Sequence, residues 1–274
     1  MENDEDSIKV GNDEETTKPP GRPVWSGSIT IGLVNIPVKV HTMILDKAFS
    51  FRLLHKEDGQ PLKYERVCTR DNKAVDWKNT AKGYEIRKNE FIVLKKEELE
   101  AIKPESDQKI KLDKFISLLS IDPVYFEKSY ILAPDNDLDA YSLLMTAIRQ
   151  EGKAGMGTIT MRTKEYPVVV YEYKGVLILT TLRYADEVVN PGDIEDFSKL
   201  KKPSQKEIEL ATKIIQGLSG EFNITEYRDS YRERIEQLIE TKMKGGVVVA
   251  RVPKKEEVKE LMVALQETIK KLGK

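Results

Sequence analysis

Apolar and polar residues alternate along Val24–Val40, whose sequence VWSGSITIGLVNIPVKV is rich in β-branched side chains and is interrupted by glycine and proline. A period of two is typical of strands with one buried face, so this segment predicts two short strands joined by a bend. Further strands are predicted at residues 90–94, 115–121, 129–132, 157–163, 167–173 and 176–182, with a hairpin turn at Tyr173-Lys174-Gly175. Many short strands with few helices between them favour an antiparallel barrel or sandwich over a doubly wound sheet.

Helical periodicity occurs once among these strands and then dominates the C-terminal third. One helix is predicted between Asp137 and Gly152, and a second between the capping box of Ser204 with Glu207 and Gly220. A third is expected over residues 225–243, and a last amphipathic helix over 255–272. The four apolar stripes comprise Leu138, Tyr141, Leu144, Met145 and Ile148; Ile208, Ala211, Ile214, Ile215 and Leu218; Tyr227, Tyr231, Ile235, Leu238, Ile239 and Met243; and Val258, Leu261, Met262, Leu265 and Ile269.

Composition limits the class of protein. The 274 residues include 45 bases and 46 acids, and the net charge of -1 excludes a globally basic nucleic-acid coat. Residues 1–18 hold seven acids, two bases and no aromatic residue, which predicts a disordered acidic tail ending at Pro19-Pro20-Gly21. The rest of the chain carries +4.

A single cysteine, Cys68, and two histidines exclude a disulfide framework and argue against a dedicated Cys/His zinc site. No apolar run approaches the roughly 20 residues that cross a bilayer, and the N-terminus lacks the features of a signal peptide. We therefore expect a soluble cytoplasmic protein without a membrane partner.

Basic charge is concentrated between Lys39 and Lys96, where 14 bases face eight acids and the net charge is +6. Phe49, Phe51, Tyr64, Trp77 and Tyr84 are interleaved with these bases, and Asp-Gly and Asp-Asn pairs indicate turns. The segment can be an extended excursion that presents lysine and arginine to phosphates. Composition alone favours the alternative, a solvated surface whose bases pair with its own acids, because scattered charge usually marks an exposed face.

Catalytic and metal chemistry lacks its usual motifs. No glycine-rich phosphate loop occurs, and Cys68 has no base positioned beside it by the sequence. Asp135, Asp137 and Asp139 lack the glycine and distal glutamate of an EF-hand, so helix capping explains them better. We predict no catalytic residue, no cofactor and no metal ligand.

Several longer strings, taken together and in order, resemble the prokaryotic Ku family. The resemblance covers about residues 22–244, which is most of the chain. The strings are WSGSITIGLVNIPVKV (25–40), FRLLHKEDGQPLKYERVC (51–68), GYE (83–85), TLRYADEV (181–188) and GEFNITEYRDSYRERIEQLIETK (220–242).

The resemblance implies a non-enzymatic homodimer that encircles double-stranded DNA ends and recruits an ATP-dependent DNA ligase for non-homologous end joining, associated with the nucleoid. It also implies a mainly β fold: an antiparallel β-barrel core, a strand-and-loop bridge over DNA and a helical C-terminal arm. On this chain we expect a tail over residues 1–21, a core over 22–195 that includes the bridge at about 41–90, an arm over 196–244, and a C-terminal helix over 245–274.

A ring that accepts any sequence must bind phosphates through lysine and arginine rather than read base edges. Trp25, Leu33 and Ile36 are expected in the barrel core, and His55 and Trp77 either touch the DNA backbone or pack beneath the bridge. The expected DNA contacts are Arg52, Lys56, Lys63, Arg66, Arg70, Lys73, Lys78, Lys82, Arg162 and Lys164. The expected dimer or arm-packing residues are Tyr227, Tyr231, Leu238 and Ile239, and their helical spacing equally fits an ordinary core within the chain.

The chain departs from the family at two places. Many bacterial relatives carry a second cysteine where Asp71 stands here, which argues against a metal-stapled bridge. Long lysine-rich C-terminal extensions are absent, and the last helix either docks the ligase or packs on the arm. The alternative function is a barrel that organises protein partners without binding DNA, which the near-neutral total charge and the amphipathic helices allow.

Overall fold

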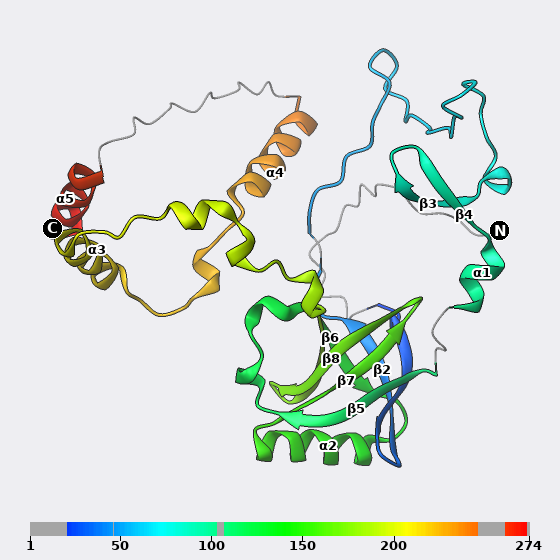
Figure 1. Ribbon diagram of the computed structural model, residues 1–274, viewed down its shortest axis with the longest axis horizontal. Coiled ribbons are helices and arrows are strands. Elements are labelled where there is room, and N and C mark those ends of the chain that lie inside the picture. Colours follow the sequence, from blue (N-terminus) through cyan, green and yellow to red (C-terminus); the bar gives the residue numbers. More distant parts are fainter. Residues whose placement is uncertain (1–20, 46, 103–106, 246–260, 273–274) are drawn as a thin grey trace. The chain divides into compact units, whose positions relative to one another are not determined.

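The structure is a computed structural model that describes residues 21–45, 47–102, 107–245 and 261–272 (Figure 1). The predicted acidic tail therefore lies outside the described residues, except for Gly21. The chain forms two compact units, one ending at Val189 and one beginning at Asn190. Each unit is described separately below.

A closed seven-stranded barrel forms the core of the first unit, as predicted. The strands follow one another around the barrel in the order β1-β2-β6-β9-β8-β7-β5. They are β1 (Trp25–Ile31), β2 (Val34–Thr42), β5 (Lys109–Ile116), β6 (Phe126–Pro134), β7 (Ala154–Met161), β8 (Lys164–Tyr173) and β9 (Val176–Leu182).

One pairing differs from the predicted antiparallel barrel, because β1 and β5 pair in parallel and close the ring of strands. The chain leaves the barrel at the end of β2, beside the start of β1, and it re-enters at Lys109, which lies beside Ser28. A strand that starts at the same end as β1 must run parallel to it. A Cβ on Gly157 would collide with the backbone carbonyl of Lys111, so glycine permits the close approach of β7 to β5.

The alternating apolar residues of the strands fill the barrel. Ile29, Val38 and Leu132 are completely buried, and Ile36 is also in this core, as predicted. Trp25 packs against it, and its indole Nε1 donates to the carbonyl of Thr160 at 3.2 Å.

The prediction that Leu33 belongs to the core is wrong, because this side chain is 99% exposed. Leu33 follows Gly32, whose φ of 57° lies in the left-handed region, and both residues form the turn between β1 and β2. The turn interrupts the alternation of the strands, and Leu33 points away from both of them.

The predicted helix α2 (Leu138–Glu151) packs into the same core where β6 ends and β9 begins. The Asp137 carboxylate caps it by accepting from the amide of Ala140 at 3.0 Å, and Gly152 ends it with a φ of 59°. Tyr141, Leu144 and Ile148 are buried. Two details differ from the prediction. Leu138 was expected on the buried stripe but is exposed at the first turn. Asp135 was expected to cap the helix but forms an ion pair with Lys39 at 2.7 Å.

The excursion, defined here as residues 43–108, connects β2 to β5 and contains its own short elements. These are the 3-10 helix η1 (Trp77–Asn79), the hairpin of β3 (Lys82–Arg87) with β4 (Glu90–Leu94), and α1 (Lys96–Ala101). The predicted strand at residues 90–94 exists, but it pairs only with β3 and is not part of the barrel.

Residues 115–121 do not form the predicted strand. β5 ends at Ile116, and the 3-10 helices η2 (Leu118–Ser120) and η3 (Pro123–Tyr125) lead into β6. Leu118 and Ile121 pack against a second cluster that includes Ala154, Val169 and Leu182. After β9, the 3-10 helix η4 (Ala185–Glu187) ends the first unit.

The second unit is helical and contains α3 (Gln205–Leu218), α4 (Ser230–Met243) and α5 (Leu261–Leu272). The predicted capping box is present: the Ser204 hydroxyl and the Glu207 carboxylate each accept from the other residue's backbone amide. α3 contacts α5, which favours packing on the arm for the last helix. The predicted start of this helix at residue 255 lies outside the described residues. The remaining elements are the 3-10 helices η5 (Pro191–Asp193), η6 (Glu195–Lys199) and η7 (Ile224–Glu226).

The helix expected over residues 225–243 begins later than predicted. Tyr227 is extended after η7, and the Asp229 carboxylate then caps α4 by accepting from the amides of Tyr231 and Arg232 at 3.0 Å. Asparagine and aspartate that bond their own following amides compete with a continuous helix, so Asn223 and Asp229 divide the segment.

Candidate nucleic-acid interface

The first basic loop of the excursion is folded by backbone bonds and one aspartate. Leu62 donates to Leu53, and Gln60 accepts from His55 at 2.8 Å. The Asp58 carboxylate accepts from the amide of Gln60 at 3.0 Å and contacts His55 Nδ1 at 2.9 Å, and these bonds lower the pKa of Asp58. His55 is thereby tied into the turn.

The second basic loop is a tighter hairpin. Val75 donates to the carbonyl of Arg66 at 2.8 Å, and Cys68 donates to that of Lys73 at 2.9 Å. Asn72 adopts a φ of 55° at the tip, a conformation that asparagine accepts more readily than most residues. This geometry places Arg70 in the exposed loop between the paired arms.

All eight basic residues predicted on the excursion have exposed side chains. Lys73 contacts the Asp71 carboxylate at 3.4 Å, and the Arg66 guanidinium lies 4.5 Å from the centre of the Trp77 ring. Within the described residues, six of the eight form no ion pair, so most of this basic charge is not neutralised by neighbouring acids. These six are Lys56, Lys63, Arg66, Arg70, Lys78 and Lys82.

The excess of basic over acidic residues lies in the first part of the excursion. Residues 97–108 carry five acids and one base, and they nearly offset the excess that precedes them. α1 contains three of these acids, including Glu97 and Glu98. The predicted phosphate contacts on the excursion, from Arg52 to Lys82, all precede this acidic stretch.

Large apolar side chains on the excursion are exposed as well. Tyr64 is 81% exposed and Trp77 is 60% exposed. Both faces of the β3–β4 hairpin are apolar, since Tyr84 and Ile92 share one face and Phe91 and Val93 share the other, and all four are exposed. An isolated two-stranded hairpin is marginally stable in water, so burial of these apolar faces against a partner surface would stabilise it.

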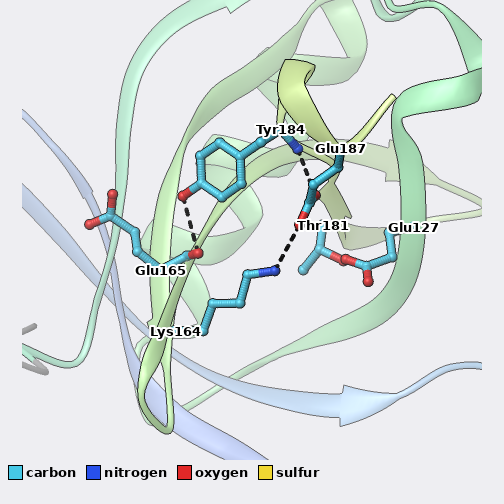
Figure 2. A network of polar contacts seen from close by, with 6 residues as sticks. All are labelled: Glu127, Lys164, Glu165, Thr181, Tyr184 and Glu187. Carbon is cyan, nitrogen blue, oxygen red and sulfur yellow. Dashed lines mark hydrogen bonds and ion pairs between the residues drawn. The ribbon is translucent and has the colours of Figure 1, made fainter. Parts of the chain in front are cut away.

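The other predicted DNA contacts lie at the turn between β7 and β8. Arg162 occupies this turn with a φ of 58° and is exposed. Lys164, the first residue of β8, donates to the Glu187 carboxylate at 3.1 Å (Figure 2). Its ammonium also lies 5.0 Å from the centre of the Tyr166 ring. Arg162 and Lys164 are close in sequence but differ in environment, because only Lys164 has an acidic partner within the described residues.

Glu187 and Tyr184 complete this network. Glu187 accepts from the amide of Tyr184 at 2.9 Å, and the Tyr184 hydroxyl donates to the carbonyl of Glu165 at 3.1 Å (Figure 2). The bonds from Tyr184 and Lys164 lower the pKa of Glu187, and the bond to Glu187 raises the pKa of Lys164. Sequence patterns did not identify Glu187, because its partner is 23 residues away in another element.

The residues predicted for the dimer or arm form an exposed set in the second unit. Tyr227 and Tyr231 are 77% and 68% exposed, and Leu238 and Ile239 are exposed too. On α4, Ile235 alone is buried. The apolar residues of this segment are thus largely uncovered in the single chain.

The described residues offer no group of three or more histidine, cysteine or acidic side chains that could hold a metal ion. Cys68 is a free, half-buried thiol, and His41 Nδ1 contacts the carbonyl of Gly21 at 3.3 Å. None of the helices in the described part of the chain is long and apolar enough to span a membrane.

Comparison with known proteins agrees with the barrel. A family model described as "Ku70/Ku80 beta-barrel domain" matches residues 30–210. The "Non-homologous end joining protein Ku" of Bacillus subtilis is 36% identical over 251 residues, covering 90% of this chain and 81% of the relative. The protein of the same name from Archaeoglobus fulgidus is 37% identical over 249 residues, covering 90% of this chain and 98% of the relative. The chain therefore belongs to the Ku family.

Proposed function

We propose that this protein binds the ends of double-stranded DNA without reading their sequence and acts in non-homologous end joining without a catalytic step of its own. The observation that carries the proposal is the exposed basic excursion on a Ku-family barrel, most of whose lysines and arginines have no acidic partner among the described residues. Relatives over most of the chain are named for this process.

The contacts are to phosphates. Duplex DNA carries about one negative charge per 1.7 Å of axis, and each lysine or arginine that neutralises a phosphate releases counterions. Contacts of this kind position a protein but carry no base information, as repair of breaks in any sequence requires. The proposed contacts are Arg52, Lys56, Lys63, Arg66, Arg70, Lys73, Lys78, Lys82 and Arg162, with Lys164 as a tenth candidate.

The functional unit is a ring-shaped homodimer. Two copies related by a twofold axis can close a ring through one self-complementary surface. The exposed apolar residues of the excursion and of the segment 222–243 supply surface for such contacts. A closed ring loads only where a duplex stops, so its topology selects ends without base contacts.

The partner that completes the reaction is an ATP-dependent DNA ligase. End joining requires a new phosphodiester bond, and we assign this chemistry to the recruited enzyme. The proposed role of the dimer is to hold and protect the end while the ligase acts.

Competition between linear and closed circular duplexes of the same sequence tests the proposal. We expect linear DNA to be bound and circular DNA to be largely ignored at physiological salt. Linear DNA with both ends closed by bulky caps is the matched control, and its binding should fall to the level of the circle. Equal binding to all three would refute end loading, and no affinity for any duplex at low salt would favour the protein-scaffold alternative.

A further inference from the structure

We infer that Lys164 and Glu187 form a clamp that fixes the point where the chain leaves the barrel, and that Glu187 is a positioning residue for DNA-end binding. The DNA part of this inference rests on the proposed function. The clamp itself lies entirely within the first unit.

One side of the clamp belongs to the barrel. Lys164 begins β8, and Tyr166, two residues further on the same face, packs against the barrel core. The Lys164 ammonium lies over the Tyr166 ring and donates to Glu187. Glu127 at the start of β6 adds a further attraction for this ammonium. The lysine is thus held above the end of the barrel where β8 begins.

The other side belongs to the segment that follows β9. The two carboxylate oxygens of Glu187 have different donors: Oε1 accepts from Lys164, and Oε2 accepts from the amide of Tyr184. The Tyr184 hydroxyl reaches back to the carbonyl of Glu165. Two links therefore join residues 184–187 to the first two residues of β8, and both are drawn in Figure 2.

A third link strengthens the attachment. The backbone amide of Arg183 donates to the carbonyl of Tyr125, and its guanidinium donates to that of Phe126, each at 2.8 Å. The segment is therefore tied to two separate barrel elements within five residues. It ends at Val189, and the second unit begins at the next residue.

This placement has a mechanical consequence. The proposed ring closes through the excursion and the second unit, and the second unit starts from the clamped segment. A fixed starting point reduces the conformational freedom that ring closure must remove. The clamp should lengthen the lifetime of a loaded ring without changing the number of phosphates that the ring contacts.

The rival role for Lys164 is a direct phosphate contact, and the two roles predict opposite effects of removing Glu187. If Lys164 binds phosphate, Glu187 competes for it, and Glu187→Ala strengthens DNA binding. If the two residues form a clamp, Glu187→Ala and Lys164→Ala shorten the lifetime on a linear duplex alike. The double variant is then no worse than Glu187→Ala, because that variant already removes the Lys164–Glu187 link together with the bond from the Tyr184 amide.

The test compares Lys164→Ala, Glu187→Ala, the double variant and Lys164→Arg, with Lys39→Ala and Asp135→Ala as a control ion pair of the same barrel. Exposed ion pairs contribute modestly, so we expect the dissociation rate from linear DNA to rise about two- to fivefold in the three alanine variants. The slope of log affinity against log salt should not change. Lys164→Arg should retain the wild-type lifetime, and the control pair should not alter it.

Hydrogen exchange provides a measurement that needs no DNA. We expect faster exchange of a peptide covering residues 183–189 in the three alanine variants, and wild-type exchange in the control pair. Tighter DNA binding by Glu187→Ala, a lower salt slope for Lys164→Ala, or unchanged exchange would overturn the clamp. Failure of the wild type to bind linear DNA would refute the proposed function and leave the exchange result to decide on the clamp.

Discussion

Arg66 and Arg70 lie on the same hairpin of the excursion, one on a paired arm and one in the loop. If both contact phosphates, the double variant Arg66→Glu/Arg70→Glu should weaken binding to linear DNA by a similar factor for any sequence. The slope of log affinity against log salt should flatten by about 0.9 for each lost phosphate contact. Filter or fluorescence binding at several salt concentrations measures both quantities.

Lys153→Glu/Lys174→Glu is the matched control, since it changes the net charge equally at exposed positions in two turns of the barrel. Its effect on the slope should be small. Arg66 also covers the Trp77 ring, so thermal unfolding of the Arg66→Glu/Arg70→Glu variant must show that the fold persists. A slope equal to that of the wild type would place the phosphate contacts elsewhere.

Single residues also show the limits of sequence patterns. Ile36 and Leu33 both belong to the same alternating string, yet Ile36 is in the core and Leu33 is almost fully exposed. Alternation of apolar and polar residues predicts burial only inside a strand. A turn residue with a positive φ ends the strand, although the hydrophobicity of the sequence does not change there. Lys164 was correctly recognised as a basic residue at a strand end, but its acidic partner comes from tertiary folding.

At the scale of elements, the Tyr141 hydroxyl links α2 to the barrel through two hydrogen bonds. The Tyr141 hydroxyl donates to the carbonyl of Leu132 at 2.7 Å and accepts from the amide of Leu177 at 2.9 Å, and all three residues are buried. Tyr141→Phe leaves both backbone groups without this partner. We expect the variant to lose about 1–3 kcal/mol in the free energy of unfolding, measured with urea.

The same hydroxyl predicts that the stability of the fold decreases at alkaline pH. Burial raises the pKa of Tyr141, so its stabilising contribution is complete below the ordinary tyrosine pKa of about 10 and is lost as the pH rises through the folded-state value. The melting temperature of the wild type should therefore fall above about pH 10, and that of Tyr141→Phe should fall less steeply. Tyr173→Phe, at an exposed tyrosine, should behave like the wild type. Equal alkaline slopes for all three proteins would contradict this account.

Elements with strong local sequence signals were predicted best. The strands of the β8–β9 hairpin, α2 and the capping box of α3 all follow from β-branched apolar runs, turn residues, helical periodicity and local caps. The start of β5 was missed, although Ile110 and Leu112 alternate with polar residues, because the denser apolar run at 115–121 suggested a strand there. Only residues 115 and 116 of this run belong to a strand, the end of β5, whereas Leu118 and Ile121 lie in the following turns and pack against Ala154, Val169 and Leu182.

At the scale of the whole molecule, the barrel and the excursion could be predicted, but the parallel closure of β1 with β5 could not. That pairing joins residues about 80 positions apart, and it is fixed by where the excursion returns. The candidate interface was predictable as a concentration of charge. The described lysines without an ion pair, the arginine stacked on Trp77 and the lysine paired with Glu187 are distinguished by contacts that no local pattern contains.

The second unit yields a prediction about assembly. Tyr227 and Tyr231 expose large aromatic surfaces beside α4, and buried aromatic residues contribute much of the binding energy of protein interfaces. If these surfaces are covered by a second copy, Tyr227→Glu/Tyr231→Glu should raise the dimer dissociation constant at least about tenfold, measured by sedimentation. Binding to linear DNA should weaken in parallel, because a monomer cannot close a ring.

Gln237→Glu/Lys242→Glu is the control, since it adds negative charge at exposed polar positions of the same helix. It should leave the dimer essentially intact, which separates the loss of aromatic contact from a general electrostatic effect. A dimer of wild-type strength in Tyr227→Glu/Tyr231→Glu would show that these tyrosines do not lie at the subunit contact. In that case binding to linear DNA should also be unchanged, because the ring must be closed to remain on an end. A loss of DNA binding without a loss of dimerisation, or the reverse, would contradict the ring.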